Sequence, residues 1–293
     1  MKVCPCCGHR FDAPDWACPC CQGSPPVIEG FLSFVRGRSF AGEAFSPEYF
    51  PRLFELEKAS FWFRHRTRLI LGAMKRYFPA TEDILEIGCG TGFMLSEIQR
   101  RCPGMRISGS DLFAEGLGFA RTRVPGASFY IMDACSMPFE EEFDLVLALD
   151  MLEHVKDDTR ALAEIFKSIK PGGGVIVTVP QHRWLWSIQD EKACHQRRYT
   201  RKDLLGRMTR SGFTIAYVTS FVSFLLPLMS LSRMYGQLWT GDPGKYDPVR
   251  ELMIHPSANF FLQGVCSLEE LLIQSGLTFP VGGSMLCVGS KEY

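Results

Sequence analysis

Short apolar segments alternate with amphipathic stretches from Asp83 onward, and this alternation constrains the fold more than any other feature of the sequence. Apolar runs of strand length that alternate with stretches of helix length are typical of a parallel sheet with helices on both faces. We therefore expect an α/β fold with a doubly wound sheet. Its strands are predicted near residues 83–87, 106–110, 127–131, 143–149, 174–179, 213–219 and 284–290, and its helices near 92–101, 114–123 and 157–169.

A glycine-rich turn follows the first predicted strand. Residues 86–92 read EIGCGTG, and such a turn lets the backbone pass close to a ligand at the N-terminus of the next helix. The glycines are spaced G-x-G-x-G, and Phe93 stands where a dinucleotide fingerprint requires its third glycine. The spacing therefore disfavours NAD. Glu86 would crowd a pyrophosphate but suits a ligand that carries an ammonium group.

Four further motifs follow this turn. Asp111 ends the second predicted strand, Asp133 and Ala134 follow the third, Asp150 follows the fourth, and the sequence KPGGG at residues 170–174 precedes the fifth. In this order the motifs resemble the class I S-adenosylmethionine-dependent methyltransferases, and the resemblance extends over about residues 83–220. It implies a Rossmann-like, seven-stranded methyltransferase sheet and S-adenosylmethionine as the cofactor.

The resemblance also implies a role for each motif. Glu86 would face the methionine end of the cofactor, and Asp111 would accept hydrogen bonds from both ribose hydroxyls, as a carboxylate readily does. Asp133 and Ala134 would bind the adenine. Judged from the residues alone, Asp111 could instead cap the following helix and Asp133 could start a turn. The residues expected to bind the cofactor are Glu86, Gly88, Cys89, Gly90, Gly92, Asp111, Leu112, Asp133, Ala134 and Leu149.

Candidate catalytic residues follow the fourth predicted strand. Asp150, Glu153 and His154 are spaced i, i+3 and i+4, which on a helical turn places them on one face. Methyl transfer needs a general base only when the acceptor is protonated; His154 is one candidate, with packing or capping as its alternative role. The segment is similar to one in the quinone-biosynthesis O-methyltransferases, whose E-x-x-E-H arrangement is associated with a divalent metal. That resemblance makes Asp150, Glu153 and His154 a candidate metal site, although Asp150 is shorter than the family's glutamate.

The loop after the fifth predicted strand carries aromatic and basic residues at the edge where open α/β sheets bind ligands. It resembles the W-S-x-x-D and H-x-R-R-Y-T pattern of methyltransferases associated with saccharide or lipid-linked substrates. His195 is the second candidate base. A structural ion pair between Asp190 and an arginine is the alternative explanation of this loop. The residues expected to contact the acceptor are Met151, Trp184, Arg198 and Tyr199.

Six of the twelve cysteines lie near the N-terminus, between Cys4 and Cys21. The phrase C-P-C-C occurs there twice, and each copy is similar to a zinc knuckle, in which two thiolates point at one ion. Four thiolates make a closed tetrahedral site with no open position for chemistry. We therefore predict a zinc ribbon, in which Cys6 and Cys20 are not ligands; a redox role for adjacent cysteines is the alternative. The predicted zinc ligands are Cys4, Cys7, Cys18 and Cys21.

Three regions are expected along the chain: the ribbon at 1–24, a linker with N-terminal helices at 25–80, and the methyltransferase domain at 81–293. Apolar residues at helical spacing predict two helices in the second region, and the basic residues from Arg64 to Arg68 are interpreted mainly as a solvated face. An apolar insertion at about 221–283, with a loop at 241–248, is predicted to form a helical pair. This pair would cover the active site or a dimer face, or would form a lid or a membrane contact.

Composition narrows the function classes. Lys plus Arg and Asp plus Glu both total 32, so no global positive field exists to hold nucleic acid. No secretion signal and no membrane span are recognised, and we expect a cytoplasmic protein or one peripheral to the inner face of the membrane. The leading function is methylation of a small or lipid-linked hydroxylated acceptor. The alternatives are an rRNA methyltransferase with the ribbon docking RNA, and a non-catalytic adaptor, which the intact cofactor motifs disfavour.

Overall fold

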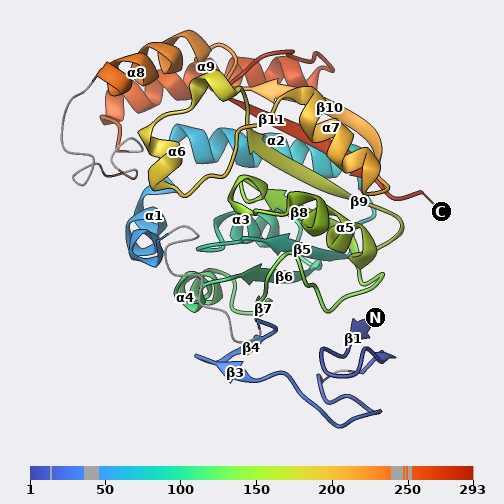
Figure 1. The fold of residues 1–293 in the computed structure, drawn as a ribbon. Helices are drawn as coiled ribbons and strands as arrows, with labels where there is room; N and C mark the ends of the chain where they lie inside the picture. Colours follow the sequence, from blue (N-terminus) through green and yellow to red (C-terminus); the bar gives the residue numbers. More distant parts are fainter. Residues whose placement is uncertain (14, 36–45, 239–246, 248, 250–252, 293) are drawn as a thin grey trace.

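A mixed sheet forms the centre of the protein (Figure 1). The computed structural model describes residues 1–13, 15–35, 46–238, 247, 249 and 253–292. In these residues the sheet has nine strands in the order β10-β11-β9-β8-β5-β6-β7-β4-β3. The strands are β3 (Val27–Ile28), β4 (Phe31–Ser33), β5 (Asp83–Ile87), β6 (Arg106–Asp111), β7 (Ser128–Ile131), β8 (Phe143–Leu149), β9 (Ile169–Pro180), β10 (Thr214–Phe221) and β11 (Ser284–Ser290).

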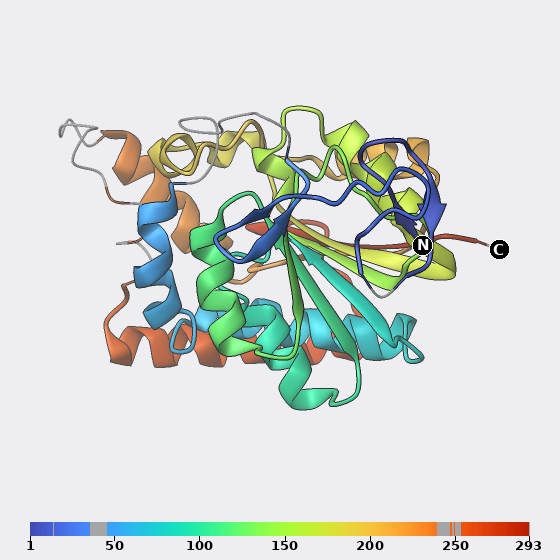
Figure 2. The ribbon, with the colours of Figure 1, turned by 90° about the horizontal axis from the view of Figure 1, so that it is seen from below.

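Six neighbouring strands, from β9 to β4, run parallel, and antiparallel β11 and β10 complete the sheet beyond β9. Parallel strands require covered faces, and helices supply the cover. Figure 2 shows α2 and α9 on one side of the sheet and α5 and α7 on the other. The helices are α1 (Phe50–Leu56), α2 (Phe61–Tyr77), α3 (Phe93–Arg101), α4 (Ala114–Arg123), α5 (Asp158–Ser168), α6 (Ile188–Lys192), α7 (Arg201–Arg210), α8 (Leu226–Leu238) and α9 (Pro256–Gln274).

The strands contribute side chains to two cores because successive residues of a strand point to opposite faces. Ile84 and Leu145 lie in the core beneath α2, α3 and α9, while Leu85 and Val146 lie in the core beneath α5 and α7. All four side chains are fully buried. This explains why the inner strands read as continuous apolar runs, and it fixes the edge at which their carboxyl ends meet.

The N-terminal ribbon packs through aromatic side chains near the edge of the sheet that carries β4 and β3. Strands β1 (Lys2–Val3) and β2 (Arg10–Phe11) pair with each other, and Trp16 packs against Phe34 and Phe139 at ring-centroid distances of 4.5 and 5.6 Å. The Val3 amide donates to the Pro138 carbonyl at 2.8 Å. Figure 2 shows the ribbon in front of this edge. The ribbon is therefore part of the main core.

The α/β class, the seven predicted strands and the predicted helices are confirmed, and the sheet contains two further strands that were not predicted. The start of the segment predicted to be a linker forms β3 and β4, which extend the sheet beyond β7 through the pair Leu32 and Tyr130. Phe31 and Ser33 are buried there, so burial and pairing stabilise strands too short for a sequence pattern. The predicted insertion contains α8 and α9; most of its predicted loop, 241–246 and 248, lies outside the described residues.

Candidate functional site

A cavity of about 520 Å³ lies at the carboxyl edge of the parallel strands, where sheets of this kind bind ligands. Its volume is in the range of small-molecule sites. Nine of the ten residues predicted to bind the cofactor line this cavity: Glu86, Gly88, Cys89, Gly90, Asp111, Leu112, Asp133, Ala134 and Leu149. The motifs that follow one another along the sequence therefore come together around one cavity.

The glycine-rich turn forms the floor of the cavity. Gly88 has a φ of +69°, and a Cβ at this position would lie 2.9 Å from the Met151 Cβ. Gly92, the tenth predicted residue, does not line the cavity. It is the N-cap residue of α3, with a φ of +72°, and its ideal Cβ would lie 2.8 Å from the Ala120 Cα of α4. The role of Gly92 is therefore the close packing of α3 against α4.

Asp111 and Asp133 hold the turns around them as well as facing the cavity. The Asp111 carboxylate accepts backbone N–H groups from Gly90 and Phe113, both at 3.0 Å, and burial raises its pKa to about 6. It does not cap α4, whose N-cap residue is Phe113. Asp133 accepts the Cys135 amide at 2.8 Å, as expected for a turn. Each carboxylate oxygen can accept a second hydrogen bond, so both side chains retain capacity for a ligand.

Glu86 is a buried carboxyl group that the nearby Arg66 compensates only in part. It is 4% exposed, its Oε2 has no hydrogen-bond partner among the described residues, and burial raises its pKa to about 8. A buried carboxyl oxygen without a hydrogen-bond partner is costly unless a ligand meets it. A cationic group in the cavity would satisfy Glu86, which fits the ammonium end of S-adenosylmethionine.

Arg66 is a site residue that the sequence interpretation missed. The basic segment of α2 was interpreted as a solvated face, but Arg66 is 8% exposed and lines the cavity. Its guanidinium stacks over Trp62 at 4.6 Å and pairs with the Asp150 carboxylate. The signal that could have found it is its helical spacing from Phe63 and Ile70, both buried.

A second cavity of about 430 Å³ adjoins the first. The two cavities share Leu53, Phe63, Asp150 and His154 as lining residues. The lining of the second cavity contains apolar residues of the insertion, named here the apolar wall, and polar residues, named here the polar wall. The apolar wall includes Val222, Leu225, Leu228, Met229 and Leu262, and the polar wall includes Glu153, His154, Gln189, His195 and Arg198.

His195, a half-buried residue of the polar wall, pairs with the buried Asp190. The His195 Nδ1 lies 2.8 Å from the Asp190 Oδ1, which also accepts the Arg198 Nε at 2.8 Å. Although burial opposes it, these partners lower the pKa of Asp190 to about 2. An ionised Asp190 places the proton of a neutral His195 on Nδ1, so that Nε2 is the basic nitrogen. The alternative of an Asp190–arginine ion pair is therefore also realised.

His154 is poorly suited to carry a proton. Burial, followed by the nearby His195, lowers its pKa to about 3. Its ring lies edge-on to that of His195, with 4.7 Å between centroids. Glu153 is 1% exposed, and burial raises its pKa well above the usual value. The two imidazole rings thus lie beside the Glu153 carboxyl group, which burial favours in its neutral form.

The expected metal site is composed differently from the prediction. Possible ligand atoms of Glu153, His154 and His195 lie within 4.8 Å of one another, whereas Asp150 pairs with Arg66. Asp150 precedes the short 3₁₀ helix Leu152–His154 with a φ of +50°, so the three predicted residues do not share a helical face. Among the described residues, the structure therefore replaces Asp150 by His195 in this cluster.

Two of the four residues expected to contact the acceptor lie outside both cavities. Trp184 is 59% exposed and stacks on His182. Tyr199 is 1% exposed, and its hydroxyl donates to the Asp158 carboxylate at 2.6 Å, so it holds α5 in place. Met151 lines the first cavity and Arg198 the second.

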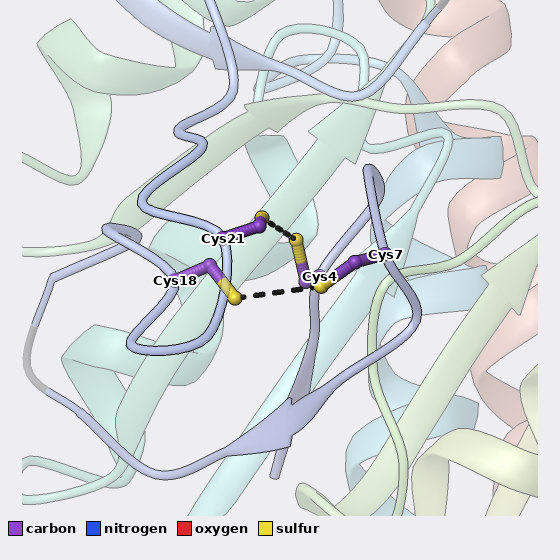
Figure 3. Close-up of side chains that lie close together, drawn as sticks. All are labelled: Cys4, Cys7, Cys18 and Cys21. Carbon is purple, nitrogen blue, oxygen red and sulfur yellow. Dashed lines mark hydrogen bonds between the residues drawn. The ribbon is translucent and has the colours of Figure 1, made fainter.

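Four cysteines of the ribbon point at one another (Figure 3). The Sγ atoms of Cys4 and Cys21 are 3.6 Å apart, and those of Cys7 and Cys18 are 3.7 Å apart. Zinc–sulfur bonds of about 2.3 Å at tetrahedral angles give sulfur–sulfur distances of about 3.8 Å. The donor set and its spacing therefore fit a zinc ion.

Known proteins match the central part of the chain. Residues 85–177 match the family described as "Methyltransferase domain". Ajmaline N-methyltransferase of Rauvolfia serpentina is 28% identical over 152 residues, covering 50% of this chain and 51% of that protein. The ubiquinone biosynthesis O-methyltransferase of Pseudomonas fluorescens is 29% identical over 102 residues, covering 33% of this chain and 43% of that protein. The chain thus spans about half or less of these curated relatives.

A solved structure extends the likeness beyond the matched segment. Phosphoethanolamine N-methyltransferase 2 of Haemonchus contortus, in complex with S-adenosyl-L-methionine, has a TM-score of 0.51 at 20% identity, covering 76% of this chain and 52% of that one. This likeness concerns the fold. Residues 85–177 of this chain thus match a methyltransferase domain, and the fold around them is similar to that of a solved methyltransferase.

Proposed function

We propose that this protein transfers a methyl group from S-adenosylmethionine to a hydroxyl of a small or lipid-linked acceptor. The observation that carries the proposal is the joining of two cavities, one lined by the cofactor motifs and the other by both the apolar wall and His195. S-adenosylmethionine, when bound, supplies an electrophilic methyl group on a sulfonium. The residues of this chain would hold both reactants in line and accept the proton of the acceptor.

Four groups in the first cavity account for cofactor binding. Glu86 would pair with the ammonium group, and Arg66, which lines the same cavity, would meet the carboxylate of the methionine end. Asp111 would accept the ribose hydroxyls, and Asp133 the exocyclic amine of adenine. Binding by charged hydrogen-bonding groups in a buried cavity is strong because water is excluded.

His195 is the base that the geometry favours. A hydroxyl acceptor loses its proton as the new oxygen–carbon bond forms, and a neutral Nε2 on the wall of the second cavity can take it. Asp190 would orient the ring and stabilise the imidazolium. His154, whose pKa is lowered to about 3, would act by packing against His195 rather than by accepting the proton.

The cluster of Glu153, His154 and His195 supports a second candidate role for this wall, as a divalent-metal site. A metal would require all three groups in their unprotonated forms and would hold an acceptor oxygen directly. Chelation distinguishes the roles: activity that survives EDTA and is lost in His195→Gln supports the base, whereas activity that requires added Mg²⁺ or Mn²⁺ supports the metal.

The acceptor class is tested by methyl incorporation. Zinc-loaded protein would be incubated with methyl-labelled S-adenosylmethionine and a cell extract, which is then separated into RNA, protein, lipid and soluble fractions. We expect label in the lipid or small-molecule fraction, at least a hundredfold less with His195→Gln, and no change with His255→Gln, an exposed histidine at the start of α9. Label chiefly in ribosomal RNA would favour the rRNA alternative, and binding without transfer to any fraction would favour the adaptor.

A further inference from the structure

The insertion presents a large apolar surface to solvent on the end of the molecule opposite the ribbon (Figure 1). Phe260 and Phe261 of α9 are 80% and 69% exposed. Phe224, which precedes α8, and four leucines of α8 and α9 are also at least 44% exposed, and clusters of exposed apolar side chains mark interaction surfaces. We name the outer α8–α9 face by its residues: Phe224, Leu228, Leu231, Phe260, Phe261, Leu268 and Leu271.

The charged side chains of α8 and α9 point away from this face. Glu269 is buried against His65, with 3.2 Å between carboxylate and imidazole, and Glu270 pairs with Arg68. Arg233 donates to Ser187. These three are the charged residues in the sequence of the two helices, so the outer α8–α9 face carries none.

Basic side chains are frequent on α2, which packs against α9, and on the segment before it. Helix α2 lies against α9, where Arg64 donates to Gln263 at 3.1 Å. Between Phe50 and Tyr77 the exposed charged residues comprise five basic side chains and a single acid, Glu55. The exposed basic residues are Arg52, Lys58, Arg64, Lys75 and Arg76. An apolar face with basic groups on a neighbouring helix complements a bilayer surface that carries anionic headgroups.

We infer that the outer α8–α9 face docks on an anionic lipid bilayer. None of the helices in the described residues is long and apolar enough to cross a membrane, so the docking would be peripheral. Leu228 is both exposed and part of the wall of the second cavity, which places the acceptor cavity directly beneath the docked face. This last step rests on the proposed function, because a lipid-linked acceptor would then enter from the membrane.

Vesicle binding tests the docking separately from methyl transfer. Zinc-loaded full-length protein would be sedimented with vesicles of phosphatidylcholine, with and without phosphatidylglycerol. We expect binding to the mixed vesicles, at least tenfold weaker with Phe260→Ser/Phe261→Ser and roughly tenfold weaker with Lys75→Gln/Arg76→Gln. The matched control is Val27→Ser/Ile28→Ser, which removes two exposed apolar side chains of β3, 65% and 46% exposed, and should leave vesicle binding unchanged.

Several outcomes would overturn the inference. One is equal sedimentation of the wild type and the Phe260→Ser/Phe261→Ser variant. Another is that the wild type does not bind vesicles but dimerises in analytical ultracentrifugation, while the Phe260→Ser/Phe261→Ser variant stays monomeric. That result would assign the face to contact with a second copy of the chain. Circular dichroism checks that each variant folds, and Phe260→Trp gives an independent readout, since quenching by brominated lipid is expected only if residue 260 enters the bilayer.

Discussion

Removal of the Trp16 side chain measures how firmly the ribbon belongs to the methyltransferase core. Trp16 is 7% exposed and contacts the rings of Phe11, Phe34, Tyr130 and Phe139. A buried tryptophan removes about 150–250 Å² from water, which at about 25 cal/mol per Å² corresponds to roughly 4–6 kcal/mol. Because the unfolded chain already buries part of that area, we expect Trp16→Ala to lower the free energy of unfolding by about 3–5 kcal/mol.

Urea unfolding followed by circular dichroism gives the comparison, with zinc present throughout. Trp184→Ala is the matched control, because Trp184 is 59% exposed and its described ring contact is with His182; its loss should cost less than about 1 kcal/mol. Tyr130 and Phe139 flank the segment that contains Asp133, so Trp16→Ala should also weaken adenosine binding. A Trp16→Ala protein as stable as the control would refute the packing of the ribbon on the sheet.

Three other predictions concern the zinc site, the cofactor cavity and the ion pair between Glu57 and Arg123. Metal analysis of protein purified without chelator should give about one zinc per chain, retained in Cys6→Ser and lost in Cys7→Ser; the reverse pattern would refute the ligand assignment. Burial raises the pKa of Asp111 to about 6, and binding of the ribose needs the ionised form, so calorimetry should show that adenosine binds about tenfold more weakly at pH 5 than at pH 7.5. The Asp111→Asn variant should bind adenosine weakly at both pH values. A wild-type affinity that does not change with pH would contradict this prediction. Arg123→Met should cost about 3–5 kcal/mol in urea unfolding, because it leaves buried Glu57 without its cation, while Arg100→Met, on an exposed pair, should cost under about 1 kcal/mol.

The sequence predicted the inner strands well because their apolar runs reflect burial on both faces of a parallel sheet. The strand predicted at 284–290 agrees with β11 at both ends. Strand β9 begins at Ile169, earlier than predicted, because its glycine-rich start is held by pairing with the C-terminal segment: the Gly172 amide donates to the Lys291 carbonyl. A contact between segments far apart in the sequence leaves no local sequence pattern that predicts it. For the same reason β3 and β4 were not predicted.

The cofactor cavity was more predictable than the acceptor side. Glu86, Asp111 and Asp133 follow strands whose carboxyl ends must meet, so topology alone brings them together. The loop after β9, which holds the residues predicted to contact the acceptor, is irregular. Its sequence shows which side chains are present but does not predict which of them point into a cavity. Tyr199 turns inward to Asp158, and Trp184 turns outward; only the three-dimensional course of the loop decides this.

Calorimetric titration with S-adenosylmethionine tests the central claim most directly. Zinc-loaded protein should bind about one equivalent, and Asp111→Ala should weaken binding by roughly 1–3 kcal/mol, or about five- to 150-fold. Asp12→Ala removes an exposed acid of the ribbon that does not line the cavity and should leave binding unchanged. Binding of NAD in preference to S-adenosylmethionine, or equal affinity of the Asp111→Ala and wild-type proteins, would contradict the account.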